Sequence, residues 1–112
     1  MESIRQQKVS RLLQKELGEM FRAESKNLFG GAFITVTTVR VSPDLGVAKV
    51  YLSVLQASDR NKVLENVKSQ LFAIKRIVSP KLKSQLRIIP EMTFFIDDSL
   101  DYAMRIEELL KK

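Results

Sequence analysis

The chain has 112 residues, of which 45% are hydrophobic and 29% charged, a length and composition that predict one soluble globular domain over residues 1–112. Because it lacks cysteine and histidine, disulfides, thiolate nucleophiles, zinc–thiolate sites and the commonest general base are excluded, and we expect no catalytic residue, metal or cofactor. No apolar run approaches the roughly 18 residues of a membrane span, and the first residues are polar, so we expect a cytoplasmic protein with no membrane partner.

The charge balance favours a polyanionic partner. Nineteen Lys and Arg stand against thirteen Asp and Glu, a net charge of +6. Cations that neutralise phosphates release bound counterions, which makes nucleic acid the leading candidate. Many small proteins carry such a charge for solubility alone, so the positions of the charges have to distinguish the two interpretations.

A long amphipathic helix is predicted from about Glu2 to Ala23. Apolar residues recur three or four positions apart on one face: Val9, Leu12, Leu13, Leu17, Met20 and Phe21. The opposite face is basic, with one arginine at its margin: Lys8, Arg11, Lys15, Arg22 and the marginal Arg5. Glu16 and Glu19 dilute this charge, so the pattern fits a nucleic-acid contact and a merely solvated face equally well.

A loop and two strands are expected next. Residues 25–31 are polar and end in two glycines, which predicts a loop. Phe33 to Val41 is rich in β-branched residues, and Val47 to Leu55 alternates, with Ala48, Val50, Leu52 and Val54 on one face. The turn residues 42–46 join the two strands in an antiparallel hairpin, with Gly46 free to adopt a positive φ. The apolar positions of the first strand change parity after Val36, which indicates a bulge or a strand buried on both faces.

A helix pair is predicted after the hairpin. Ser58 and Asp59 are N-cap candidates, and apolar residues continue at helical spacing: Val63, Leu64, Val67, Leu71 and Ile74. Since proline has no amide donor, the helical pattern is expected to bend, break or restart near Ser79–Pro80. A further helical piece is expected to end near Ser84.

A third strand and a short C-terminal helix complete the predicted order. Leu86 to Asp97 alternates, and Pro90 implies an edge position or a bulge; the apolar face is Leu86, Ile88, Met92, Phe94 and Ile96. Residues 97–99 can cap a helix that carries Ala103, Ile106, Leu109 and Leu110. The predicted fold is therefore an α+β two-layer domain, a three-stranded sheet with helices on one face. This order is similar to the type II KH-like arrangement of RNA-binding domains.

Two motifs point to a family. Residues 39–53 read VRVSPDLGVAKVYLS and residues 86–99 read LRIIPEMTFFIDDS. Both resemble signatures of bacterial ribosome-binding factor A, in the expected order and separation, and the first helix agrees as well. Most matching residues also have a structural explanation, since Pro43 and Asp44 suit the turn and Val50 and Phe94 the core. They identify the family better than they identify a site.

The resemblance implies a KH-like assembly factor that binds the small ribosomal subunit and its 16S rRNA near the neck and decoding region. It also implies a role, without catalysis, in late maturation of that rRNA, including 5′-end processing, and in growth in the cold. We expect a monomer with no small-molecule substrate. Another ribosome-associated protein, such as a hibernation factor or a structural small-subunit protein, has similar size and charge, and only the two motifs argue against it.

The helix pair departs from the family pattern. Family members interrupt it with Ala-x-Gly, where RNA-binding KH domains carry Gly-x-x-Gly, whereas this chain has no glycine after Gly46 and residues 69–76 read SQLFAIKR. Either Ala73-Ile74-Lys75 replaces the motif or Ser79–Pro80 supplies the bend.

The candidate RNA-binding residues form two groups. Residues 75–87 contain no Asp or Glu and hold the first group: Lys75, Arg76, Lys81, Lys83 and Arg87. The second group is the basic face of the first helix: Arg5, Lys8, Arg11 and Lys15. We expect the first group to dominate through phosphate contacts, with the shape of folded rRNA giving specificity; a solvated helix face is the alternative. Tyr51 and Phe95 lie away from the predicted core and either stack on bases or are covered by the C-terminal helix.

Overall fold

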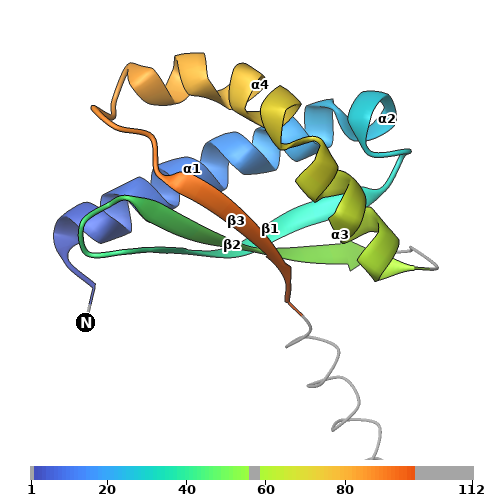
Figure 1. Cartoon of the computed structure of the whole chain (residues 1–112), viewed down its shortest axis with the longest axis horizontal. Coiled ribbons are helices and arrows are strands. Elements are labelled where there is room, and N and C mark those ends of the chain that lie inside the picture. The colour runs from blue at the N-terminus through green and yellow to red at the C-terminus, as the bar shows by residue number, and fades with distance from the viewer. Residues whose placement is uncertain (1, 56–58, 98–112) are drawn as a thin grey trace, which may run out of the picture.

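The computed structural model describes residues 2–55 and 59–97 and has two layers, a three-stranded sheet and a layer of helices (Figure 1). The elements in chain order are α1 (Ile4–Ala23), α2 (Ser25–Leu28), β1 (Phe33–Val41), β2 (Val47–Leu55), α3 (Arg60–Ser69), α4 (Leu71–Lys83) and β3 (Glu91–Ile96). The strand order is β1-β2-β3, with β1 antiparallel and β3 parallel to β2. The α+β, KH-like order of helix, two strands, helix pair and strand is therefore present. The C-terminal helix predicted after Asp97 lies outside the described residues.

Helix α1 begins at a capping box. The amide N–H of Gln6 donates to Ser3 Oγ at 3.1 Å, and Gln6 Oε1 accepts from the Ser3 amide at 2.7 Å. The other side-chain atom, Gln6 Nε2, donates to the Val41 carbonyl at 2.8 Å. Burial of Gln6 is thereby compensated, and the start of α1 is held against the end of β1.

The segment predicted as a loop, residues 25–31, contains the short helix α2. The Phe29 amide donates to the Ser25 carbonyl, and the buried Phe29 ring lies 5.1 Å from the ring of Phe21. Gly30 and Gly31 then adopt positive φ angles of 62° and 82° and lead into β1. The loop prediction was wrong because polar composition did not reveal that packing of Phe29 stabilises a helical turn.

The hairpin is antiparallel and has the predicted strand bounds. Register shifts between Val36 and Thr38, so Thr37 is an extra residue on β1 and the predicted bulge is confirmed. The bulge keeps the apolar residues on both of its sides in the core: Ile34, Val36, Val39 and Val41. In the turn, the positive φ of 60° falls at Leu45 and not at Gly46, contrary to expectation. The Leu45 amide donates to the Ser42 carbonyl at 2.9 Å, which closes the turn at that residue.

The helix pair breaks at Gln70, at neither predicted position. Asp59 caps α3 by accepting from the Asn61 and Lys62 amides, and Gln70 joins the two helices with φ −93° and ψ 12°. This conformation needs no glycine, so the two helices can separate here without the Ala-x-Gly of the family that the sequence resembles. Pro80 lies inside α4, which runs on to Lys83. Of the predicted bend, break or restart near Ser79–Pro80, the break and the restart were wrong, because Pro80 is exposed near the end of α4 while Val78 and Leu82 on either side are buried in the core.

Strand β3 begins at Glu91, five residues later than predicted. The parallel pairing begins with Glu91 opposite Val47, the first residue of β2. Residues 86–90 therefore lie beyond the end of β2 and have no residue of that strand opposite them. Ile88, predicted on the core face, is 75% exposed. Pro90 lies just before the strand, and β3 is an edge strand as predicted.

The core lies between the helices and one face of the sheet. Its largest fully buried side chains come from α1, β2, α3, α4 and β3 and include Leu17, Leu52, Ile74 and Phe94. Helices α1 and α4 run beside each other over this face (Figure 1). The other sides of α1 and α4 are thereby exposed, and the candidate basic residues lie there except Arg87, which follows α4.

Candidate nucleic-acid interface

A shallow groove runs along the exposed side of α4. Its volume is about 510 Å³. Its lining residues recur three or four positions apart along the helix: Phe72, Lys75, Arg76, Ser79, Pro80 and Lys83. We call this surface the α4 groove. Phe72 is 75% exposed, an unusual position for a large aromatic side chain. The groove therefore combines three cations with an exposed ring.

The cations of the α4 groove are not neutralised locally. Among the described residues, Lys75, Arg76 and Lys83 form no ion pair, and no Asp or Glu lines the groove. Their charge is available to an external anion. Since all three project from one helix, their spacing is set by a rigid element.

Lys81 has a different environment. Its Nζ lies 3.9 Å from Oε2 of Glu16 on α1, and Glu16 is buried with this oxygen lacking a hydrogen-bond partner among the described residues. Lys81 therefore acts as a counter-ion across the contact between α1 and α4. Although residues 75–87 contain no acidic residue, the fold brings one to Lys81 from a distant part of the chain.

A second basic hollow, which we call the end pocket, forms where the start of α1, the β1–β2 turn and the α4–β3 connection meet. Its volume is about 450 Å³, and its lining comes from all three segments: Arg5, Lys8, Val9, Asp44, Leu45, Gly46, Gln85, Leu86, Arg87 and Ile88. The structure thus brings Arg87 of the first candidate group together with Arg5 and Lys8 of the second. Arg11 and Lys15 are exposed on α1 and line neither hollow.

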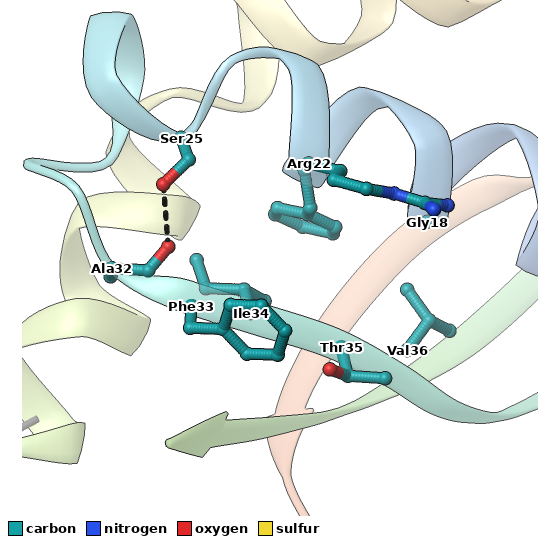
Figure 2. A pocket seen from close by; sticks show the side chains of 9 residues that line it. Gly18, Arg22, Ser25, Ala32, Phe33, Ile34, Thr35 and Val36 are labelled. Atoms are coloured by element: carbon teal, nitrogen blue, oxygen red, sulfur yellow. Dashed lines mark hydrogen bonds between the residues drawn. The ribbon is translucent and has the colours of Figure 1, made fainter. Parts of the chain in front are cut away.

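A third hollow, about 550 Å³, lies between α1 and the edge strand β1 (Figure 2). Ser25 Oγ donates to the Ala32 carbonyl at 2.8 Å at one end, while Gly18 leaves room on the helix side. The lining is mainly apolar and contains one cation, Arg22. None of the candidate RNA-binding residues lines it.

On the outer face of the sheet, Tyr51 and Phe95 stack on each other, with ring centroids 5.3 Å apart and planes inclined by 25°. Both side chains are half-buried. Each ring thus already has one aromatic neighbour.

The sequence interpretation missed Phe72. Phe72 can be assigned to the α4 groove only once the bounds of α4 are known. Because α4 begins at Leu71 and continues through Pro80, four residues share one face of it: Phe72, Lys75, Arg76 and Lys83. The segment SQLFAIKR contained this signal.

No helix within residues 2–55 and 59–97 is long and apolar enough to cross a membrane. In the same part of the chain, no group of three or more Asp or Glu residues is arranged to hold a metal ion.

Comparison with known proteins gives one consistent family. The family model described as Ribosome-binding factor A matches residues 5–110. A ribosome-binding factor A of Cytophaga hutchinsonii is 46% identical over 112 residues, covering 100% of this chain and 84% of that protein. The crystal structure of ribosome-binding factor A from Thermus thermophilus has a TM-score of 0.66 at 19% identity, over 81% of this chain and 94% of that one. A homology model of the Thermus thermophilus factor, fitted into a cryo-EM map of its complex with the 30S subunit, has a TM-score of 0.62 at 22% identity and covers 80% of this chain and 91% of that one.

Proposed function

The chain belongs to the ribosome-binding factor A family, and we propose that it binds the small ribosomal subunit through rRNA held on the α4 groove. The observation that carries the proposal is that Lys75, Arg76 and Lys83, which have no ion-pair partner in the described part of the chain, line one groove with the exposed ring of Phe72. The fitted Thermus thermophilus complex supports the choice of the 30S subunit as partner.

The chemistry of the groove suits RNA. Lys and Arg contact phosphate oxygens whatever the base, while an exposed aromatic ring stacks on an unpaired base. Such stacking is typically worth about 1–3 kcal/mol per base. Lys81, Arg11 and Lys15 contribute only to the general attraction, because Lys81 is engaged with Glu16 and the other two line no hollow with the remaining candidates.

The proposed role is assistance in late maturation of 16S rRNA, including processing of the 5′ end of its precursor. The protein acts as a cytoplasmic monomer, without catalysis, and supports growth in the cold. This finer role is supported by the resemblance of the two sequence motifs, and the lack of catalysis by a sequence that has no His or Cys.

Sedimentation of tagged protein from growing cells tests the proposal. We expect the protein in fractions with immature small subunits whose rRNA retains an unprocessed 5′ end. Recovery only with intact ribosomes from starved cells would indicate a hibernation factor, and a constant ratio to mature small subunits a structural subunit protein.

The absence of catalysis is tested separately. Purified protein incubated with precursor rRNA is expected to leave it intact. Cleavage that survives purification and disappears in a point variant would contradict the proposal.

A further inference from the structure

The end pocket has features of a ligand site that the α4 groove lacks. Its lining includes the apolar residues Val9, Leu45, Leu86 and Ile88, the last of which is 75% exposed. The cations Arg5, Lys8 and Arg87 line the same hollow from two separate segments. Apolar and cationic groups are therefore combined in one concave site.

The described lining of the end pocket carries three cations and one carboxylate, so its charge is only partly compensated. Within the described part of the chain, Arg5, Lys8 and Arg87 form no ion pair. The one carboxylate there, Asp44, accepts from Ser42 Oγ at 2.6 Å and from the Gly46 amide at 3.0 Å, and so is engaged within its own turn. Like charges around one hollow repel one another, and an anion relieves that repulsion.

The backbone also marks this site. Leu45 holds a φ of 60°, in the left-handed region, where a residue other than glycine typically costs about 1 kcal/mol or more. The Leu45 side chain lines the pocket. The next residue is Gly46, which could hold the same φ without strain, yet the left-handed position is occupied by the residue with the large apolar side chain. Strain of this kind persists where the surrounding structure or a function requires the side chain at that place.

We propose that the end pocket binds one unpaired nucleotide of RNA, a proposal that rests on the RNA binding proposed above and adds a second contact to it. The base lies against Leu45, Leu86 and Ile88, and the flanking phosphates lie on Arg5, Lys8 and Arg87. The volume of about 450 Å³ falls in the usual range for pockets that enclose small organic groups. RNA suits the site because its loops and bulges present unstacked bases beside phosphates, whereas a paired helix does not.

Two RNA hairpins of equal length and charge test the proposal, one fully paired and one with a single bulged nucleotide. Wild-type protein is expected to bind the bulged hairpin about tenfold more tightly in fluorescence anisotropy. Ile88→Ser is expected to abolish this preference while leaving affinity for the paired hairpin unchanged. The matched control Phe33→Ser, which alters another exposed apolar side chain outside the pocket, is expected to keep the preference.

A second measurement needs no variant. Amide chemical shifts of wild-type protein are recorded with the bulged hairpin, with adenosine monophosphate and with an acidic peptide. Shifts confined to the end pocket and saturated at the lowest concentration by the bulged hairpin support the proposal. Equal or tighter binding of the free nucleotide, or of the peptide, would overturn it in favour of that ligand.

The outcomes separate this proposal from the proposed function. If wild-type protein binds both hairpins equally and the pocket amides do not shift, the end pocket is not a nucleotide site, although binding to small subunits can still stand. If neither hairpin nor small subunits bind, the proposed function fails as well.

Discussion

Neutralising the α4 groove should weaken binding to the small subunit in a strongly salt-dependent way. The variant Lys75→Gln/Arg76→Gln/Lys83→Gln removes the three cations that line the groove without an ion-pair partner among the described residues. It spares Lys81, whose loss would leave the buried Glu16 without its counter-ion and so mix stability with binding.

The expected magnitude follows from counterion release. Each phosphate contact contributes about 0.7–0.9 to the slope of log affinity against log salt, so losing three contacts lowers the slope by about 2–3. The ratio of wild-type to variant affinity should then fall by about 20- to 40-fold between roughly 50 and 200 mM salt. A change in shape or in one base contact would not produce this dependence.

The assay is a titration of labelled protein with purified small subunits at four salt concentrations. The matched control, Arg11→Gln/Lys15→Gln/Arg22→Gln, removes three exposed charges from α1 and is expected to lose less affinity and less slope. Because exposed substitutions typically change stability by less than about 0.5 kcal/mol each, both variants should fold, which thermal melts will check. An unchanged slope in the α4 variant, or a greater loss in the α1 control, would refute the assignment of the RNA surface to α4.

Three further predictions concern stability. Lys81→Met should lower the free energy of unfolding, measured by urea titration, by under about 1 kcal/mol, because Lys81 is largely exposed. The same variant should leave RNA affinity at high salt, measured by fluorescence anisotropy, unchanged. Gln70→Gly should destabilise the chain by about 0.5–1 kcal/mol, since the break between α3 and α4 has a negative φ and glycine adds freedom to the unfolded state; a stabilised variant would contradict this. Hydrogen bonds from Ser42 and, to a smaller extent, from Gly46 lower the pKa of Asp44 in the folded protein. Its carboxylate therefore contributes stability above the unfolded pKa of 3.8, and this contribution is lost as pH falls through the folded pKa. In acid titrations, Asp44→Asn should make the free energy of unfolding depend less on pH in this range.

Local periodicity was sufficient where burial alternates along one element. The three- and four-residue spacing of α1 and the two-residue alternation of β2 follow directly from which side of each element faces the core. The change of parity on β1 could be read in the same way, and the bulge at Thr37 confirmed it. These features need no knowledge of which element lies opposite.

Local signals failed where a distant partner sets the boundary. Proline at position 80 predicted a break, yet the packing of Val78 and Leu82 keeps α4 continuous. Alternation from Leu86 predicted a longer strand, yet β3 can pair only where β2 exists. Phe29 appeared to belong to a loop until its ring was seen against Phe21.

The sequence by itself determined the family, the order of the strands and of the longer helices, and the excess of positive charge, because motifs, periodicity and composition are properties of neighbouring residues. Only the tertiary structure decided which cations act together. Lys81 meets Glu16 across two helices, while Arg87 joins Arg5 and Lys8 from the other end of the described chain. The physical reason is that electrostatic interaction and pocket formation depend on distance in space, and chain folding brings together charges that the sequence separates by many residues.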